Sequence, residues 1–337
     1  MPDSRAVARW LKQHMPEFAG SLELKKIMGG QSNPTFQLTT QSGRFVLRRK
    51  PSGQLLKSAH AVEREFRVQK ALAGSDVPVA RMRVLCEDDK VIGSAFYVMD
   101  HVAGRSFDNP SLAGMSCAAR TRVYDEMNRV LAAIHSVDID AVGLADFGPK
   151  GNYFERQIAR WIKQYRASET ESLPDMDELM DWLAANTPAD DGRRTLVHGD
   201  FRIDNMLFDP HREEVLAMLD WELSTIGHPF ADLGSVIMQW QMPQGKEGRG
   251  LAGVDRVALG IPSDEAFIAA YCRRMGLPGI DRFGFYLAFC FFRMGAIIQG
   301  VMKRAMDGNA ADPDRAMRLG TFVPRFARAG LEATRHG

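Results

Sequence analysis

One run of polar residues in the second half of the 337-residue chain constrains its fold more than any other feature. His198, Asp200 and Asn205 follow the spacing H-x-D-x-x-x-x-N, and an apolar segment after a turn ends at Asp220. The residues from Asp200 to Asn205 let the chain loop back, and a short pair of strands is predicted between Asn205 and Asp220. The pattern therefore predicts that two carboxylates and one amide lie together around a loop and a hairpin.

This set of side chains suits the transfer of a phosphoryl group from ATP to a hydroxyl. Asp200 is expected to accept the proton of the attacking hydroxyl and to orient it. The triphosphate requires Mg²⁺, a hard cation that prefers oxygen ligands, and Asn205 and Asp220 are expected to supply them. The catalytic loop and metal-binding Asp of protein kinases have the same spacing, with Arg where this chain has Gly199 and Asp-Phe-Gly where it has Asp-Trp-Glu. On its own, Asp200 would also suit a cap of the turn that follows it.

Three further residues are expected to support this loop. The ring of His198 is expected to be buried and to bond the loop backbone. Asp204, next to Asn205, is interpreted as a turn former rather than a second catalytic residue. Asp232, within the segment His-Pro-Phe-Ala-Asp-Leu-Gly, is expected to accept backbone N–H bonds that brace the loop.

Strand-like and helix-like patterns divide unevenly along the chain and predict an α+β fold, with a β-rich N-lobe at 1–100 and a mostly α-helical C-lobe at 101–337. Strands are predicted at 22–28, 35–40, 44–50, 82–86, 91–99, 206–208 and 215–219. Helices are predicted at 4–14, 60–73, 117–136, 153–166, 175–185, 264–274, 284–306 and 313–333.

Composition argues against several other classes of protein. Apolar residues make up 45% of the chain and charged residues 25%, which is typical of a soluble globular protein. The 43 Lys and Arg residues nearly balance the 42 Asp and Glu residues, so no overall charge draws the chain to nucleic acid or to an anionic membrane. The four cysteines have no C-x-x-C spacing and are expected to be inert, reduced thiols.

The longest apolar stretch, at 283–302, has about the length of a membrane span. Arg293 lies at its middle, however, and three glycines interrupt it. A buried helix is therefore the favoured interpretation. The first residues also lack the basic-then-apolar pattern of a signal peptide. The chain is expected to be soluble and cytoplasmic, with no nucleic-acid or membrane partner.

Three motifs together resemble those of the aminoglycoside phosphotransferase family, a group of small-molecule kinases. They are His-Gly-Asp-x4-Asn, Leu-Asp-Trp-Glu and Pro-Phe-Ala-Asp-Leu-Gly, and the resemblance extends from about residue 20 to about residue 305. Three further segments are most similar to the kinase-like domains of some acyl-CoA dehydrogenase fusions. These are Phe-Val-Leu-Arg-Arg-Lys-Pro, Ser-Ala-His-Ala-Val-Glu-Arg-Glu-Phe and Tyr-Val-Met-Asp-His-Val-Ala-Gly-Arg. The resemblance implies a two-lobed, protein-kinase-like fold that binds ATP and Mg²⁺.

The resemblance also implies nucleotide-binding residues in the N-terminal third. Glu65 matches the acid that pairs with the family's phosphate-binding lysine, and Glu63 is the alternative. Small residues match the loop over the phosphates, where backbone N–H groups approach, although an ordinary polar hairpin loop would look the same. That loop contains Gly30, Gln31, Ser32 and Asn33. The hinge that contacts adenine through its main chain is matched by Met99, Asp100 and Val102.

One position departs from the family pattern. Arg48 stands where the family has its phosphate-binding lysine, and Lys50 follows two residues later. Alternation along a strand puts both side chains on one face, so either of them is able to reach the phosphates. The departure supports an alternative hypothesis, in which the chain binds a nucleotide with little or no turnover.

The helices expected to surround the phosphate acceptor are basic. Cations outnumber acids in the predicted helix 153–166, and no acid occurs between Asp281 and Asp307. Arg293 lies in the apolar part of this stretch, where a buried guanidinium requires an anion. Because aminoglycosides are polycations, the acceptor is expected to be anionic or neutral, and the dehydrogenase resemblance points to a hydroxy acid or a hydroxyacyl-CoA thioester. A protein substrate is disfavoured because little chain after Asp220 is left for an activation segment. The candidate acceptor residues are Arg293, Tyr153, Arg156, Trp221 and Glu222.

Overall fold

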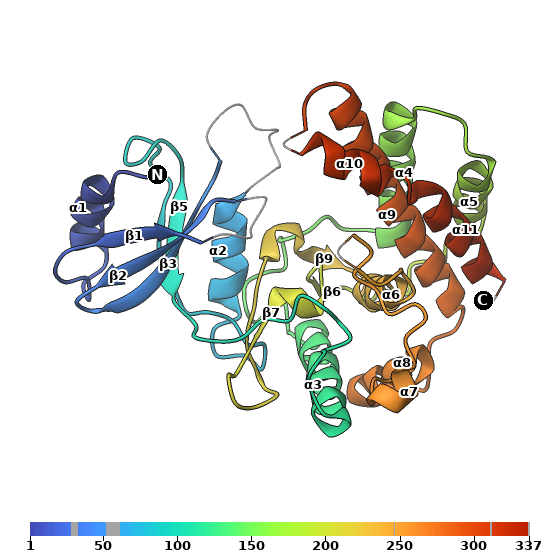
Figure 1. Ribbon diagram of the computed structural model, residues 1–337, viewed down its shortest axis with the longest axis horizontal. Helices are drawn as coiled ribbons and strands as arrows, with labels where there is room; N and C mark the ends of the chain where they lie inside the picture. Colours follow the sequence, from blue (N-terminus) through green and yellow to red (C-terminus); the bar gives the residue numbers. More distant parts are fainter. Residues whose placement is uncertain (28–32, 52–60, 246, 311, 336–337) are drawn as a thin grey trace. The chain divides into compact units, whose positions relative to one another are not determined.

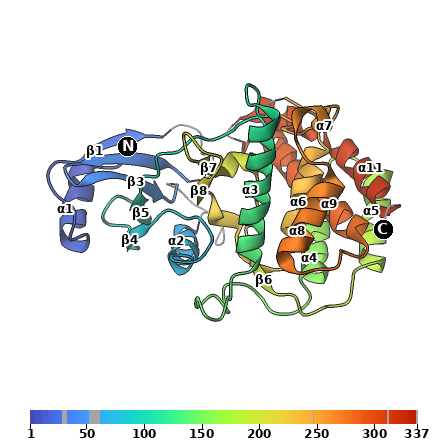
Figure 2. The same ribbon diagram turned by 90° about the horizontal axis from the view of Figure 1, so that it is seen from below.

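The structure, a computed structural model of the chain, describes residues 1–27, 33–51, 61–245, 247–310 and 312–335 (Figures 1 and 2). It divides into two compact units. The first contains Met1–Phe107, Val137–Leu144 and Ile203–Ser224, and the second contains Asp108–Ser136, Ala145–Arg202 and Thr225–Gly337. Each unit therefore combines segments that are far apart in the sequence. The predicted lobes, 1–100 and 101–337, are continuous segments, and that division stays a prediction.

The first unit is built on an antiparallel five-stranded sheet with the strand order β1-β2-β3-β5-β4. Alternation of apolar and polar residues explains the register of two of these strands, because Phe36 lies opposite Leu47 and Leu38 lies opposite Phe45. All four side chains are buried in one cluster. The strands are β1 (Glu23–Lys26), β2 (Thr35–Thr40), β3 (Gly43–Arg49), β4 (Met82–Cys86) and β5 (Phe96–Asp100).

One helix packs on each face of this sheet. α1 (Ser4–His14) begins at Asp3, whose side chain caps the helix, and its apolar side joins the cluster that contains Phe96 of β5. α2 (Val62–Ala71) covers the opposite face, where Phe66 packs with Tyr97. The two faces are opposite because successive side chains of a strand alternate. α2 thereby presents Glu65, in its first turn, to the sheet.

The hairpin that follows the H-x-D-x4-N motif also belongs to the first unit. β7 (Met206–Phe208) pairs with β8 (Val215–Met218), and 3₁₀ turns flank them at η1 (Ile203–Asn205) and η2 (Trp221–Leu223). Asn205 precedes the first strand and Asp220 follows the second, so both lie at the same end of the hairpin. The backbones of Arg105 and Phe208 exchange two hydrogen bonds of 2.8 Å, which attach β7 to the segment after β5.

The second unit is mostly helical and is organised around α9 (Phe283–Met306), which packs against α4, α5, α6, α10 and α11 (Figure 1). Two short strands of this unit, β6 (Thr195–Val197) and β9 (Thr225–Gly227), pair in antiparallel fashion. The other helices are α3 (Cys117–His135), α4 (Tyr153–Ser168), α5 (Pro174–Ala185), α6 (Phe230–Trp240), α7 (Arg256–Leu259), α8 (Asp264–Met275), α10 (Pro313–Gly320) and α11 (Val323–Thr334).

α9 contains the long apolar stretch noted in the sequence. Among the residues that the structure describes, it is the one helix long and apolar enough to cross a membrane, with a mean hydropathy of 1.6 in its most apolar window. Of that window, 61% is buried inside the protein. A helix that is apolar on most sides is also the expected core helix of a helical domain, which agrees with the packing of α9.

The structure differs from the predicted elements in two boundaries and in four elements that were not predicted. The predicted helix 313–333 is interrupted between Gly320 and Val323, because Pro324 lacks the N–H that a continuous helix requires and instead stands in the first turn of α11. The predicted strand 91–99 begins only at Phe96, after a turn in which Gly93 has a φ of +83°. The short elements β6, β9 and α7 were not predicted, and neither was α6, whose first residues were interpreted only as a motif.

Candidate active site

The first unit contains a cavity of about 520 Å³ against one face of its sheet. Its walls are mainly apolar, with a charged group at Arg48 and Asp220. A cavity of this size and character is typical of small-molecule sites. The lining residues are Ile27, Thr35, Val46, Arg48, Gln69, Ala80, Tyr97, Met99, Asp100, His101, Val102, Ala103, Gly104, Leu207, Pro210, Leu219 and Asp220.

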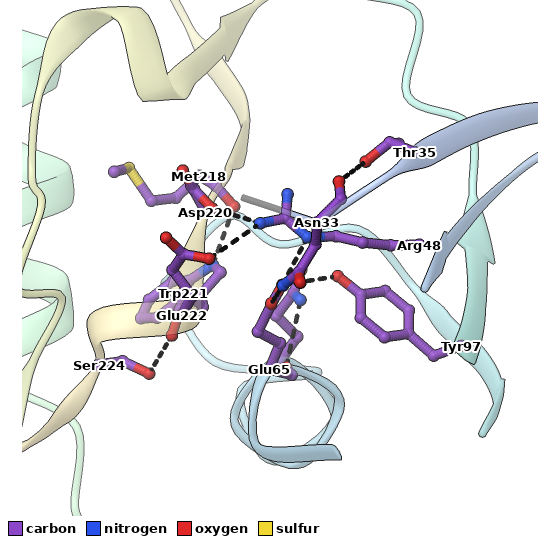
Figure 3. Close-up of polar contacts among 11 residues, drawn as sticks. Asn33, Thr35, Arg48, Glu65, Tyr97, Met218, Asp220, Trp221, Glu222 and Ser224 are labelled. Atoms are coloured by element: carbon purple, nitrogen blue, oxygen red, sulfur yellow. Dashed lines mark hydrogen bonds and ion pairs between the residues drawn. The ribbon is translucent and has the colours of Figure 1, made fainter. Parts of the chain in front are cut away.

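Arg48, on β3, lies at the centre of the polar contacts (Figure 3). Its Nε lies 3.0 Å from Oε2 of Glu65, and its Nη2 lies 2.5 Å from Oδ1 of Asp220. The same Nη2 lies 3.6 Å from Oε2 of Glu222. The Arg48 side chain is only 13% exposed, so one guanidinium links three carboxylates with little access to water.

Glu65 is the most deeply buried acid of this group, with 1% of its surface exposed. Tyr97 donates its hydroxyl to Oε2 at 3.0 Å, and Asn33 donates Nδ2 to Oε1 at 2.7 Å (Figure 3). Burial raises the pKa of Glu65 to about 7, because desolvation of the carboxylate outweighs the attraction of Arg48 and the hydrogen bond from Tyr97. These donors hold the Glu65 carboxyl in one place, and Glu65 in turn holds the Nε side of Arg48.

The two basic residues of β3 have different partners. Lys50 pairs with Glu63 at 2.9 Å and does not line the cavity, whereas Arg48 pairs with Glu65 and does. Both predicted acids of α2 are therefore engaged, each by a different cation. Asn33 is part of the Glu65 contacts, and the remaining residues predicted for the phosphate-covering loop lie outside the described residues. These are Gly30, Gln31 and Ser32.

The end of β5 forms the apolar wall of the cavity. Met99, Asp100 and Val102, which were predicted to contact adenine, all line it. Asp100 also receives two hydrogen bonds from Arg83, at 2.6 and 2.9 Å, which fix this segment from outside the cavity. The His101 N–H donates to the Arg44 carbonyl at 3.3 Å. The Val102 N–H has no acceptor among the described residues, so a ligand is able to use it.

Asn205 and Asp220 supply the oxygen donors of a candidate metal site. The Leu219 N–H donates to the Asn205 carbonyl at 2.7 Å, which holds the two ends of the hairpin together. Asp220 itself has a left-handed backbone with a φ of +63°, unusual for a residue with a Cβ. An amide and a carboxylate fit Mg²⁺, which takes one or two protein ligands and completes its shell with phosphate and water oxygens. The described residues contain no cluster of three or more His, Cys, Asp or Glu that would form a complete protein cage.

Asp200 and the residues around it belong to the second unit. His198 is fully buried, and its Nδ1 accepts the Asp200 N–H at 3.2 Å. Asp232, also buried, accepts the N–H groups of His198 and Gly199 at 2.6 and 2.9 Å. Burial alone would raise the pKa of Asp232, but hydrogen bonds from His135 and from the loop backbone lower it below its ordinary value. The loop that presents Asp200 is therefore braced by a buried, ionised carboxylate.

Two arginines contact this loop, and one of them was not predicted. Arg202 lies within the H-x-D-x4-N motif, and its Nε is 3.2 Å from Oδ1 of Asp200. Arg293 of α9 donates Nη2 to the Gly199 carbonyl at 2.9 Å. No carboxylate among the described residues forms an ion pair with Arg293. The position of Arg202 between the two predicted functional residues was the signal that sequence reasoning missed.

The other candidate acceptor residues have structural contacts of their own. Arg156 donates to carbonyls of the loop before α4, including Lys150 at 2.8 Å. Trp221 is 1% exposed, and its Nε1 donates to the Met218 carbonyl at 2.9 Å, so it offers almost no surface to a ligand. Glu222 lies near Arg48. Burial raises the pKa of Tyr153 to about 12, an effect that the positive charge of Arg293 reduces.

Comparison with known proteins identifies the family. The profile of the phosphotransferase enzyme family matches residues 23–286. The chain belongs to the phosphotransferase enzyme family. The predicted enzyme class, a phosphotransferase, and the predicted kinase-like fold are both confirmed. The resemblance to kinase-like domains of acyl-CoA dehydrogenase fusions is confirmed as well.

The curated relatives of this phosphotransferase are longer proteins. It is 49% identical over 320 residues to acyl-CoA dehydrogenase family member 10 of Mus musculus, an alignment that covers 94% of this chain and 30% of the relative. It is 41% identical over 343 residues to acyl-CoA dehydrogenase family member 11 of Rattus norvegicus, covering 99% of this chain and 43% of the relative. The chain thus spans less than half the length of these relatives.

Solved structures show the same fold. A Ralstonia eutropha protein assigned provisionally to the aminoglycoside phosphotransferases matches with a TM-score of 0.92 and 49% identity, covering 100% of this chain and 99% of that one. An aminoglycoside phosphotransferase crystallised with ADP and hygromycin B matches with a TM-score of 0.62 and 18% identity, covering 96% and 99%. Choline kinase from Cryptosporidium parvum matches with a TM-score of 0.63 and 13% identity, covering 98% and 97%. The last two show the fold alone.

Proposed function

We propose that this phosphotransferase uses ATP and Mg²⁺ to phosphorylate a hydroxyl group of a small acceptor. The observation that carries the proposal is the cavity of the first unit, which joins an apolar wall and the available N–H of Val102, just after β5, to Arg48 and Asp220. A nucleotide matches this arrangement, because it has a flat, largely apolar base at one end and a charged phosphate chain at the other. The neighbours crystallised with ADP or AMP-PNP share this fold, which supports a nucleotide as the ligand.

Each residue near the phosphates has a defined task in this proposal. The Val102 N–H and the Asp100 carbonyl bond the base, and Arg48, rather than Lys50, binds the phosphates because it lines the cavity. Asn205 and Asp220 hold Mg²⁺, which when bound neutralises charge that develops on the transferred group. The left-handed backbone of Asp220 directs its carboxylate, and the hydrogen bond between Leu219 and Asn205 keeps the two ligands together.

Asp200 acts as the general base in this proposal. It accepts the proton of the acceptor hydroxyl as the oxygen attacks the γ-phosphorus, and the bond from that phosphorus to the leaving oxygen breaks. Asp232 and His198 keep the loop in position through bonds to its backbone. The Nε of Arg202 lies 3.2 Å from Oδ1 of Asp200 and orients that carboxylate.

An anionic or neutral acceptor fits better than a polycation. Arg202 and Arg293 contact consecutive residues of the loop, Asp200 and Gly199, and each guanidinium has five N–H donors. The acceptor proposed on this basis is a hydroxy acid or a hydroxyacyl-CoA thioester, and the acyl-CoA dehydrogenase relatives support that chemistry. The proposed location is the cytoplasm, and no nucleic-acid or membrane partner is proposed.

The alternative is a module of the same fold that binds nucleotide without turnover. It is favoured by one observation, which is that Arg48 replaces the family lysine and contacts three carboxylates. The two functions differ in one measurable respect. A kinase releases ADP in response to an acceptor, whereas the binding module does not.

The test is ADP release from Mg-ATP across a panel of acceptors that contains aminoglycosides, neutral sugars, amino alcohols, hydroxy acids and hydroxyacyl-CoA thioesters. We expect stimulation by an anionic or neutral class, and a loss of about 10²- to 10⁴-fold in the Asp200→Asn variant, since the general base is removed. Asp204→Asn, a change of the same kind four residues away, is the matched control and is expected to retain turnover. Near-normal turnover in Asp200→Asn would refute the assignment of the base, and stimulation only by aminoglycosides would refute the acceptor class.

A further inference from the structure

Arg48 is in contact with the carboxylate that the proposed metal site needs. Its Nη2 lies 2.5 Å from Asp220, while its Nε is bound to Glu65 at 3.0 Å (Figure 3). A cation at Asp220 would therefore have to approach a carboxylate that already has a positively charged partner. Coulomb repulsion between two cations this close is substantial, because the Arg48 side chain is only 13% exposed.

The guanidinium of Arg48 contacts two carboxylates through two different nitrogens, whereas the ammonium of a lysine has only one nitrogen. Arginine presents Nε–H and Nη–H donors along different directions of one rigid plane, whereas lysine has a single nitrogen. The Nε side of Arg48 is fixed, because Glu65 is buried and is itself held by Tyr97 and Asn33. The Nη2 side points to Asp220 and Glu222 at the cavity (Figure 3). Arg48 is thus able to change its partner at Nη2 without losing its anchor.

We propose that Arg48 is a positioning residue that couples the binding of nucleotide to the binding of metal. In the contact with Asp220, its Nη2 occupies the carboxylate and opposes a cation there. The nucleotide's phosphates replace Asp220 as the partner of Nη2, and Asp220 is then released to the metal. This proposal deepens the proposed function and rests on it, since it requires Asp220 to be a metal ligand and the cavity to bind a nucleotide.

The charges of the surrounding groups agree with this exchange. Asp220 and Glu222 are both acidic, so the removal of Arg48 leaves two carboxylates without the cation that lies between them. A second cation would then be strongly attracted. By linkage, a nucleotide that removes Arg48 from Asp220 strengthens metal binding by the same factor as the metal strengthens nucleotide binding.

The experiment measures Mn²⁺ binding by the intact chain, with Mn²⁺ as the probe and the electron paramagnetic resonance of free Mn²⁺ as the readout. Titrations are made without nucleotide and with ADP, for the wild type, Arg48→Gln and the matched control Lys50→Gln. The control removes one positive charge from the same strand, but Lys50 pairs with Glu63 instead. We expect Arg48→Gln to bind Mn²⁺ without nucleotide roughly tenfold more tightly than the wild type and the control. The strengthening of Mn²⁺ binding by ADP is expected to shrink in Arg48→Gln only.

Two further variants make the result decisive. Arg48→Gln combined with Glu65→Gln removes the buried partner as well, and it is expected to show the same gain if the single variant fails to fold. Arg48→Gln combined with Asp220→Asn is expected to lose the gain, which locates the metal at Asp220. Equal Mn²⁺ affinity in Arg48→Gln and Lys50→Gln, including no detectable binding in either, would overturn the coupling. If no variant binds Mn²⁺ even with ADP, the proposed function itself fails.

Discussion

At the residue scale, Asp232 shows how one buried carboxylate organises a loop. It accepts two consecutive N–H groups, from His198 and Gly199, and its own surface is 1% exposed. A neutral side chain of the same shape is able to accept only one of these bonds, because the amide nitrogen of Asn is a donor. The charge of Asp232, and not only its size, is therefore required.

The substitution Asp232→Asn is expected to lower the free energy of unfolding at neutral pH by about 1–3 kcal/mol, since it leaves a buried N–H without an acceptor. The pKa of Asp232 is lowered from its ordinary value of 3.8, so its contribution is present above that value and is lost as pH falls through the lowered pKa. Wild type should therefore lose this stability below about pH 4, and Asp232→Asn should lack that component. Urea unfolding at several pH values measures it, with Asp190→Asn as a control in an exposed turn. A variant with the wild-type acid profile would contradict the role of the charge.

At the scale of elements, the segment after β5 is able to lie close to β7 because it contains a glycine. Gly104 follows β5 and lies against β7, where a Cβ would be 2.8 Å from the Phe208 carbonyl oxygen and 3.0 Å from the Leu207 Cβ. The backbone hydrogen bonds between Arg105 and Phe208 hold this spacing. Gly104 and Leu207 both line the cavity, so the close approach also shapes the proposed nucleotide site.

The substitution Gly104→Ala is expected to cost about 1–3 kcal/mol of stability, because the backbone of β7 must move to admit a methyl group. It should also weaken nucleotide binding, since β7 forms part of the cavity wall. Gly279→Ala is the matched control, because a Cβ there meets nothing within 4 Å and the backbone is not left-handed. Thermal unfolding and ADP titration of both variants measure the effects. Equal behaviour of the two alanine variants would show that the contact with Phe208 is easily relaxed.

At the scale of the whole molecule, the cavity lies entirely within the first compact unit. That unit takes in 203–224 besides the N-terminal residues, so the hairpin with Asn205 and Asp220 shares a packing unit with Arg48 and the hinge. A nucleotide in this cavity would therefore contact segments that are distant in sequence but belong to one compact body.

Mg-ADP is accordingly expected to protect the first unit from hydrogen exchange, most strongly in peptides that cover 44–51, 96–107 and 203–224. At a concentration 100 times its dissociation constant, a ligand stabilises the state that binds it by about 2.7 kcal/mol. Comparing exchange with ADP alone and with Mg-ADP gives the additional protection that is due to the metal. The Asp220→Ala variant is expected to lose this additional protection. Protection that is absent from all three segments would contradict the location of the nucleotide site.

Several secondary-structure elements and the family of this protein follow from the sequence alone. The strand pattern predicts β2 and β4 with the bounds that the structure has, and the helical periodicity predicts α1 in the same way. Both are local signals, so they do not depend on packing. The spacing from His198 to Asp220 is also local, and it specified the family through the identity of its residues rather than through their positions in space.

Other features were decided only by the tertiary structure. Period-two alternation places Arg48 and Lys50 on the same face, and only the position of α2 beside the sheet pairs Arg48 with Glu65 and Lys50 with Glu63. The contact between Arg48 and Asp220 joins residues 172 positions apart, and no local pattern specifies it. Pairing of charged side chains depends on where distant elements pack, because a sequence states which charges exist and the packing determines which of them meet.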